Sequence, residues 1–260
     1  MSRIANDPGP EWNDAMDNTV FISLSHQMAM RRSMDVIANN LANMSTTAFK
    51  REGMMFKEFL MTPKGAPPSA QNKVAFVQDV GVSRDMEAGE IVETGNTLDF
   101  AINGKGFFTL SAPNGEERYT RSGHFHINEE GRLMTTDGLP VLNEVGREIT
   151  LNPQDSSFTV ASDGTITTSQ GAIGRLKLVR FAEDARLEKI GSTQFITDAT
   201  PRPATGAKVI QGSYESSNVQ PILEMTHMIE VLRGYQTTSR IMKDYNDLER
   251  SAIQKLGKVA

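Results

Sequence analysis

Two histidines, His124 and His126, come nearest to the spacing of a metal site in this sequence. We expect them to lie on one strand with both imidazoles on the same face, where Glu129 or Glu130 could supply a third ligand. The alternative is a pair of surface histidines, because the other two histidines add no recognisable ligand spacing. We therefore assign no metal and no cofactor to the chain.

The loop Asn103-Gly104-Lys105-Gly106 has a composition that could bind phosphate. A dinucleotide-binding loop has a third glycine, an NTPase loop ends in Gly-Lys-Ser/Thr, and a helix follows in both cases. Here Phe107 and Phe108 follow, which favour a strand. The loop is therefore predicted to be a tight turn.

The spacing of the other residues does not indicate a catalytic site that uses a nucleophile or an acid–base pair. The chain has no cysteine, which excludes a thiolate nucleophile, a disulfide and a zinc–thiolate site. The acidic pairs Glu116-Glu117 and Glu129-Glu130 are adjacent in sequence and cannot face each other across a substrate. No nucleophile, base and orienting group can be combined, so we predict no catalytic residues and no enzyme.

The composition predicts a folded protein of ordinary charge. The chain has 260 residues, 38% of them hydrophobic, and a formal charge of −5, which argues against nucleic acid as a partner. No apolar run approaches the roughly 20 residues that span a bilayer, and no basic and apolar signal segment opens the sequence. We expect no membrane insertion, and any export must use another route.

Near the start, a helical pattern follows an aperiodic leader. Residues 1–15 show no periodicity and are predicted to be a disordered leader. From Val20 to Met44 one narrow apolar stripe has spacings of 4, 3, 4 and 3, which predicts a helix. The stripe comprises Met30, Met34, Ile37, Leu41 and Met44. The hydroxyl-rich segment 45–50 should stop or bend this helix.

The middle of the chain has the pattern of short antiparallel strands. The proline-rich stretch 62–73 predicts a linker, after which glycines recur between short alternating runs. Asp137-Gly138 and Asp163-Gly164 each lie between apolar runs and predict hairpin turns. The run 175–181 alternates charged and apolar residues, so one face of the strand should be buried and the other exposed to solvent.

The helical period returns near the end of the chain. From Pro221 to Val259 apolar positions recur at alternating spacings of three and four, which predicts a helix of roughly 60 Å. The stripe comprises Met228, Val231, Tyr235, Thr238, Met242, Tyr245, Glu249, Ala252, Leu256 and Val259. Such a helix is long for a chain of this size.

We predict an α+β fold in which long N- and C-terminal helices pair as a coiled-coil stem and carry a central, mostly antiparallel β domain. The predicted segments are a leader (1–15), an N-terminal helix and following segment (16–61), a linker (62–80), a β-rich domain (81–212) and a C-terminal helix (213–260). The alternative is that both helices cover the sheet. In a stem, the remaining apolar surface would be covered by neighbouring copies.

Four sequence segments resemble the flagellar rod and hook axial protein family. The first runs from Asp35 through Asn39-Asn40-Leu41-Ala42-Asn43 to Phe49-Lys50, and it is similar to the N-terminal signature of that family. The others are 95–108, 119–123 and 212–235. Together they cover the chain from about residue 16 to the end, and the resemblance suggests Met16 as an alternative start. Where the family has glycine this chain has Ala48, whose methyl group would strain a left-handed backbone, so either the turn differs or the segment is helical.

The resemblance implies a structural subunit of the basal-body rod, closer to the proximal rod than to the distal rod or hook. It implies polymerisation with itself and with other rod proteins to transmit torque. It also implies passage through the flagellar export apparatus without signal cleavage, and a place in the periplasmic rod. The residues expected to carry assembly are Asn39, Asn40, Leu41, Ala42, Asn43, Thr47, Phe49, Lys50, Asn218, Val219, Met228, Tyr235, Met242 and Tyr245.

Within this set, the three asparagines could cap backbone groups, link helices or fix helix register, or they could be solvated positions. Phe49 and Lys50 would form an apolar plug and a charged rim at a subunit contact. Two other classes of function are a β-rich extracellular binding module and an enzyme. Deletion of residues 221–260 would separate them, since only a rod subunit needs the terminal helix.

Overall fold

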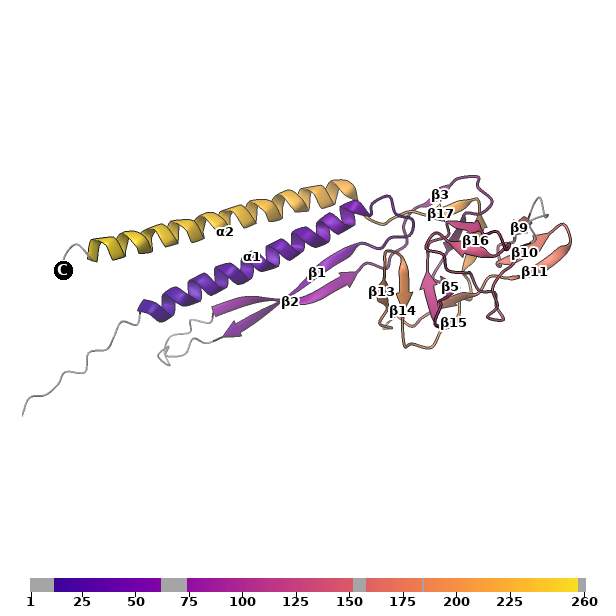
Figure 1. Ribbon diagram of the computed structural model, residues 1–260, viewed down its shortest axis with the longest axis horizontal. Coiled ribbons are helices and arrows are strands. Elements are labelled where there is room, and N and C mark those ends of the chain that lie inside the picture. The colour runs from indigo at the N-terminus through magenta and orange to yellow at the C-terminus, as the bar shows by residue number, and fades with distance from the viewer. Residues whose placement is uncertain (1–11, 62–73, 152–157, 184, 257–260) are drawn as a thin grey trace, which may run out of the picture. The chain divides into compact units, whose positions relative to one another are not determined.

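The computed structural model describes residues 12–61, 74–151, 158–183 and 185–256. These residues divide into two compact units. Unit 1 draws on residues 1–41, 52–84 and 221–260, and unit 2 on residues 42–51 and 85–220. Unit 1 contains two long helices and a hairpin, and unit 2 contains the short strands (Figure 1). The α+β class with mostly antiparallel sheets is confirmed.

Helix α1 spans Trp12–Ala42. It begins four residues inside the predicted leader, which corrects that boundary, and residues 1–11 lie outside the described chain. The helix ends before the hydroxyl-rich segment, as predicted, and Ala48 has a φ of 56°. The backbone at Ala48 is therefore left-handed, although the strain from its methyl group had favoured a different turn or a helical segment.

Helix α2 spans Pro221–Leu256, with proline at its first position and Glu224 in its first turn. The less exposed positions on its surface include Met228, Val231, Tyr235, Thr238, Met242 and Tyr245. They confirm that part of the predicted stripe, whereas positions 249, 252, 256 and 259 lie outside the described side chains. No described helix has an apolar stretch long enough to cross a membrane.

The two helices of unit 1 run in opposite directions (Figure 1) and meet at three described points. His26 Nδ1 lies 3.3 Å from Thr238 Oγ1, and Asn40 Nδ2 lies 3.1 Å from Glu224 Oε2. Between them, a Cβ placed on Gly234 would lie 2.6 Å from Met30 Cε. The three contact residues on α1 are separated by four and then ten residues along the sequence. Their partners on α2 are separated by the same numbers of residues in the opposite direction. The three points therefore share one antiparallel register.

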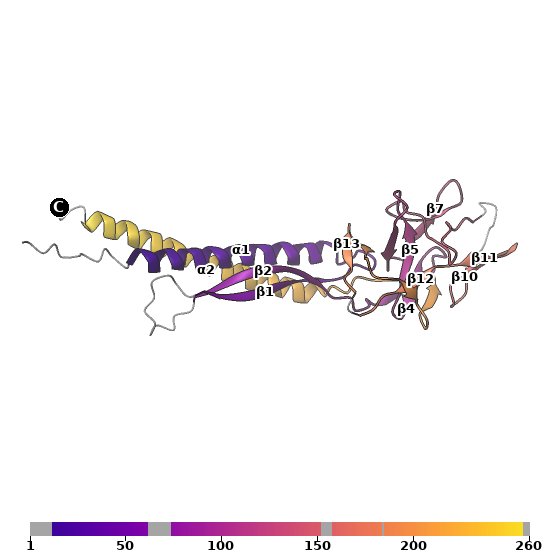
Figure 2. The ribbon, with the colours of Figure 1, turned by 90° about the horizontal axis from the view of Figure 1, so that it is seen from below.

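A hairpin completes unit 1 and was not predicted. Strand β1 (Glu52–Met61) pairs antiparallel with β2 (Val74–Arg84), with a bulge at Met55/Phe56, and Figure 2 shows the twist of this ribbon. Residues 52–61 belong to the segment that was expected to follow the N-terminal helix, and 74–80 to the end of the expected linker. The two apolar runs on either side of the proline-rich stretch pair with each other. Residues 62–73 lie outside the described chain.

Unit 2 is built from short strands, and all its pairings are antiparallel. The largest sheet has the order β13-β14-β6-β5-β12-β15, a second has the order β11-β10-β9, and three further pairs are β16-β4, β17-β3 and β7-β8. The strands are β3 Ile91–Glu93, β4 Phe100–Asn103, β5 Phe107–Ser111, β6 Glu117–Thr120, β7 Phe125–Ile127, β8 Leu133–Thr135, β9 Phe158–Val160, β10 Thr165–Thr168, β11 Gly171–Arg175, β12 Leu178–Arg180, β13 Glu188–Ile190, β14 Gln194–Ile196, β15 Arg202–Pro203, β16 Lys208–Gln211 and β17 Ser213–Glu215.

Both predicted hairpin turns are confirmed. Gly138 and Gly164 have φ of 78° and 88°, which glycine adopts without steric cost. The run 175–181 is more complex than predicted, because Leu176 and Leu178 pack on one core whereas Val179 and Phe181 pack on another. The alternation of charged and apolar residues had predicted one buried face, but the apolar side chains of this segment are buried in two separate cores.

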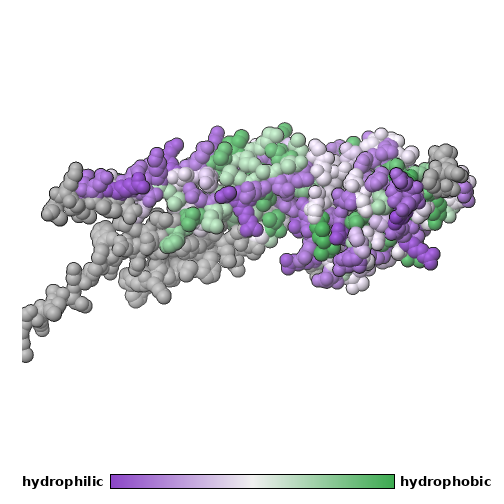
Figure 3. All heavy atoms as spheres, viewed as in Figure 1, coloured by the Kyte–Doolittle hydropathy of each residue, from purple (hydrophilic) through white to green (hydrophobic). Residues whose placement is uncertain are grey.

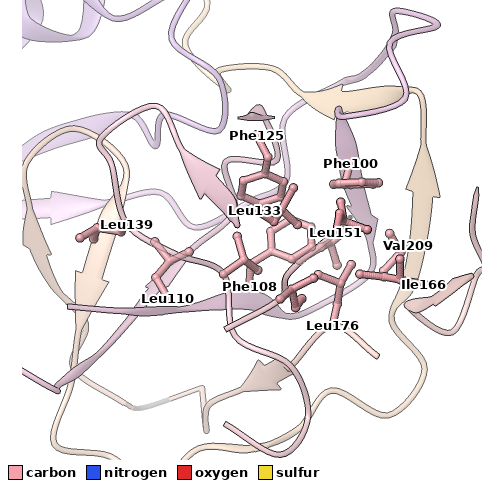
Figure 4. Close-up of a cluster of buried hydrophobic side chains, with 13 residues drawn as sticks. Phe100, Phe108, Leu110, Phe125, Leu133, Leu139, Leu151, Ile166, Leu176 and Val209 are labelled. Atoms are coloured by element: carbon pink, nitrogen blue, oxygen red, sulfur yellow. The ribbon is translucent and has the colours of Figure 1, made fainter. Parts of the chain in front are cut away.

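The main core lies inside unit 2. Its buried members include Phe100, Phe108, Leu110, Phe125 and Leu133, which converge in Figure 4. Phe108 and Phe125 meet edge to face with ring centroids 5.3 Å apart. A smaller cluster is centred on Phe107, Tyr119, Val179 and Phe195. Phe107 and Phe108 thus enter opposite faces of one strand, as expected.

Candidate functional site

A buried charge centre in unit 2 joins the sequence segments that were singled out as motifs. Lys50 follows α1, Arg121 follows β6, and Glu215 ends β17. Their side chains are 1%, 5% and 1% exposed. Buried charges require partners, because removing an ion from water is costly unless another charge and hydrogen bonds replace the solvent.

Glu215 is the shared acceptor of this centre. Lys50 Nζ lies 2.6 Å from its Oε1, and Arg121 Nε lies 2.6 Å from its Oε2. The backbone N–H of Gly89 donates to Oε1 at 3.1 Å. Each carboxylate oxygen therefore holds one cation, and the single carboxylate neutralises one of two positive charges.

The second positive charge is offset by backbone carbonyls. Arg121 Nη1 donates to the oxygens of Gly104 (3.0 Å) and Gly106 (2.7 Å), and Nη2 donates to that of Ile102 (3.0 Å). The glycine-containing loop therefore directs its carbonyl oxygens at a guanidinium. A phosphate loop directs its N–H groups at an anion, so this geometry supports the predicted structural turn and not phosphate binding.

Asn218 joins the two ends of unit 2 beside this centre. The backbone N–H of Arg51 donates to Asn218 Oδ1 at 2.7 Å. Asn218 Nδ2 donates to the carbonyl oxygens of Asp85 (3.0 Å) and Glu87 (3.1 Å). Lys50 Nζ also donates to the Glu87 oxygen, at 2.5 Å. The segment after α1 and the segment before α2 are therefore held by one network.

Ala48 lies at the edge of the same network. Its N–H donates to the Glu215 carbonyl at 2.8 Å, and the residue is fully buried. Its left-handed backbone costs an L-residue roughly 1–2 kcal/mol, so the surrounding contacts must hold it there.

Phe49 and Lys50 are buried within their own chain. Phe49 is 0% exposed, and Lys189 Nζ lies 4.2 Å from the centroid of its ring. Burial lowers the pKa of Lys50 below its ordinary value, although the nearby Glu215 carboxylate opposes this effect. These residues do not form the exposed plug and rim that the sequence suggested, because their surfaces are used inside unit 2.

Asn40 is the polar centre of unit 1 and differs from its two neighbouring asparagines. It is 0% exposed. Its Nδ2 donates to the Glu52 carbonyl at 2.7 Å and to Glu224 Oε2 at 3.1 Å, while its Oδ1 accepts from the Glu52 N–H at 2.9 Å. Asn39 is exposed and bonds Glu52 Oε2, and Asn43 accepts from Thr46 Oγ1. Asn40 is thus the one of the three that contacts both the other helix and β1 through described hydrogen bonds.

The outward face of α2 carries a second apolar stripe, distinct from the predicted one. Its members are exposed by 43–79% and have spacings of 3, 4 and 3: Ile222, Met225, Ile229 and Leu232. In Figure 3 the apolar colour along α2 lies toward its N-terminal part and the polar colour toward its C-terminal end. A shorter stripe on α1, Phe21, Leu24 and Met28, is exposed by 44–66%.

The histidine pair is not brought to a common site. His124 Nδ1 lies 2.6 Å from Asp99 Oδ1, and Thr94 Oγ1 donates to the other oxygen of Asp99 at 2.7 Å. His126 is exposed on β7. Within the described ranges, no three His, Asp or Glu side chains are grouped to hold a metal ion.

The remaining predicted residues lie around these features. In unit 1, Leu41 is half-buried at the end of α1. In unit 2, Ala42 is exposed, Thr47 is half-buried and Val219 is buried. Their role in assembly stays a prediction.

Arg121, Glu215 and Glu224 lie in the segments that resemble the family, but no role was predicted for them from the sequence. Arg121 is the one charged residue of the segment 119–123, and Glu215 is the one charged residue of 212–219. A lone charge within an otherwise neutral motif was the available signal. Glu224 is 1% exposed although it lies in the first turn of a long helix, and its burial is visible only in the structure.

Comparison with known proteins gives a consistent result along the chain. Residues 23–50 match the family model "Flagella basal body rod protein", residues 101–168 match "Flagellar hook protein FlgE/F/G D1 domain", and residues 210–255 match "Flagellar basal body rod FlgEFG protein C-terminal".

Full-length relatives show the same similarity. The chain is 43% identical to the flagellar basal-body rod protein FlgF of Caulobacter vibrioides, over 94% of this chain and 100% of that protein. It is 33% identical to FlgF of Mesorhizobium japonicum, over 93% and 99% of the two chains. It is also 30% identical to the rod protein FlgG of a Buchnera aphidicola subspecies, over 93% and 99%.

Proposed function

Because the chain belongs to the family of flagellar basal-body rod proteins and is a structural rod subunit, we propose that it polymerises through its two terminal helices. The partners are further copies of this chain and other rod proteins. The assembled helices transmit torque along the rod, and the subunit itself catalyses no reaction.

The observation that carries this proposal is the outward apolar stripe of α2. Ile229, at its middle, is 51% exposed, and Ile222 is 79% exposed. A soluble monomer rarely leaves a regular apolar stripe in water, since each large apolar side chain gains roughly 1.5–3 kcal/mol on full burial. Other helices of a polymer would cover this stripe.

The pairing of α1 with α2 as a coiled-coil stem is part of the proposal. Three points of contact in one antiparallel register support it, as does the alternating three and four spacing of the half-buried positions on α2. The buried Asn40–Glu224 contact would fix the register, because a slipped pairing would leave both polar groups buried without each other. A stiff helix pair suits a load-bearing rod.

Export and location are further parts of the proposal. We expect the subunit to pass through the flagellar export apparatus without signal cleavage and to assemble in the periplasmic section of the rod. The similarity to rod proteins along nearly the whole chain supports this route.

The proposal is tested in a strain that lacks the gene for this chain and carries a plasmid copy. We expect the unaltered chain to restore swimming and to be present in purified basal bodies. Ile229→Glu places a charge in the middle of the apolar stripe, so it should abolish both. Gln236→Glu is the matched control, because it adds the same charge at an exposed polar position two turns further along α2.

Normal swimming with Ile229→Glu, with the variant present in basal bodies, would contradict assembly through this face. Hydrogen exchange of β5 should be the same in both variants, which separates an assembly defect from a folding defect in unit 2.

A further inference from the structure

The exposed stripes on the two helices have complementary spacings. On α1 the steps from Phe21 to Leu24 to Met28 are three and four residues. On α2, read backwards, the steps from Leu232 to Ile229 to Met225 are also three and four. Two helices that run in opposite directions can therefore place these residues opposite each other in three consecutive pairs.

The three pairs cannot form within one copy of the chain. The register inside unit 1 places Met30 against Gly234, and it therefore brings Leu24 alongside position 240. Matching Leu24 with Ile229 requires α2 to be displaced by eleven residues, about 16 Å along the helix at 1.5 Å per residue. Eleven residues are close to three helical turns, so the stripe keeps its orientation after the shift.

A second copy is the occupant that fits both stripes. One copy would offer its α2 stripe and the next its α1 stripe, so the contact is between different surfaces. Contacts of this kind generate closed rings or open helical assemblies of many copies, whereas a contact between identical surfaces closes as a dimer.

The size of the contact agrees with assembly in a polymer and not as an isolated pair. The six paired side chains are 43–66% exposed, so even at about 250 Å² each, the upper value for a large aromatic side chain, they offer no more than about 800 Å². Stable complexes bury about 1,200 Å² or more. One such contact is therefore weak alone, and an interior copy that uses both stripes doubles it.

We propose that neighbouring copies of this chain pack the α2 stripe of one against the α1 stripe of the next, antiparallel and displaced by about 16 Å from the register within a copy. The pairs are Phe21 with Leu232, Leu24 with Ile229, and Met28 with Met225. This inference rests on the proposed function, since it specifies which faces meet when subunits polymerise.

Disulfide cross-linking tests the register directly, because the chain has no cysteine of its own. The variant Leu24→Cys/Ile229→Cys is expressed in the deletion strain, and cells are treated with copper–phenanthroline as the oxidant. Within one copy these positions are about 16 Å apart along the helices, beyond the roughly 7 Å limit for a disulfide. A bond between them must therefore link two chains, and we expect a ladder of covalent multimers.

Two variants serve as controls. Leu24→Cys/Ile222→Cys uses another member of the same stripe, two turns away, and should give no ladder. Met30→Cys/Gly234→Cys matches the contact inside one copy and should give an internally bonded monomer. Met28→Cys/Met225→Cys repeats the test at a second pair in the proposed register.

The outcomes separate this inference from the proposed function. The register is judged in cells that swim and whose basal bodies contain the variants. In such cells, the absence of a ladder from both in-register pairs would overturn the register. A ladder from the Ile222 control as strong as theirs would also overturn it. Products that stop at dimers overturn the contact between different surfaces. Absence of even the unaltered chain from basal bodies overturns the proposed function, and this inference with it.

Discussion

Removing the carboxylate of Glu215 should destabilise unit 2 more than any other single loss of charge among the described ion pairs. Glu215→Gln preserves shape but leaves Lys50 and Arg121 facing a neutral amide, with side chains only 1% and 5% exposed. Breaking a buried pair by removing one partner costs about 3–5 kcal/mol, because an uncompensated charge remains buried. We expect Glu215→Gln to lower the free energy of unfolding of unit 2 by that amount.

The chain supplies a matched control for this substitution. Lys105 and Glu183 also lie 2.6 Å apart, but their side chains are 82% and 87% exposed. Glu183→Gln should therefore produce no measurable change, because water screens an exposed pair. The comparison holds the ion-pair distance constant and varies burial.

A double variant tests the charge argument itself. Lys50→Met combined with Glu215→Gln removes one cation together with the carboxylate and leaves Arg121 with its three carbonyl partners. The double variant should be more stable than Glu215→Gln alone, since one of the two uncompensated charges is gone.

The assay is hydrogen exchange of the β5 amides in the full chain, measured by mass spectrometry under native conditions. It reports the opening of unit 2 separately from unit 1. Equal exchange in Glu215→Gln and Glu183→Gln would refute the importance of the buried centre. The charge argument would be refuted if the double variant loses as much free energy of unfolding as Lys50→Met and Glu215→Gln lose together when measured singly.

Three further predictions follow from single residues. Ala48→Val should destabilise unit 2 by about 2 kcal/mol or more in urea titrations, because a β-branched side chain is forced into a left-handed, fully buried position; no change would contradict the backbone geometry. Asn40→Ala should cost about 2–3 kcal/mol, since it removes the three hydrogen bonds of a fully buried side chain, whereas the exposed Asn39→Ala should cost far less; equal losses would contradict the central position of Asn40. Burial and the nearby Glu117 raise the pKa of Tyr119 to about 12, so absorbance at 295 nm should show one late-ionising tyrosine that Tyr119→Phe removes. Because unfolded tyrosine ionises near 10, Tyr119 should also make unit 2 less stable as pH rises from about 10 toward 12, and a Tyr119→Phe chain with unchanged alkaline behaviour would contradict this.

The sequence predicted the two helices because their signal is local. Helix periodicity is carried by residues three and four positions apart, and the half-buried positions on α2 match the predicted stripe from Met228 to Tyr245. The turns at Gly138 and Gly164 were predictable for the same reason, since each depends on a dipeptide.

The hairpin β1–β2 was missed because its pairing spans the proline-rich stretch. Prolines and glycines mark a break in regular structure, but they do not show whether the segments on either side separate or pair. The run 175–181 failed for a related reason. Its alternation predicts which side chains share a face, but it does not show that Val179 and Phe181 pack in a second apolar cluster.

The sequence identified one member of the charge centre but not the partners that surround it. Lys50 was named as a site residue, yet its partner Glu215 lies 165 residues away. Neither periodicity nor spacing encodes a contact at that separation. The expected role of Phe49 and Lys50 at a subunit surface was wrong for this reason, because burial by distant segments is a tertiary property.

The central claim is that subunits of the rod cover the outward stripe of α2, and thiol labelling tests it most directly. A single Ile229→Cys variant supplies one thiol in a chain that otherwise has none. Its reaction with a water-soluble maleimide is timed in the free subunit and in purified basal bodies. We predict rapid labelling of the free subunit and strong protection in the rod, whereas equal rates in both, with the variant present in the rod, would contradict the claim.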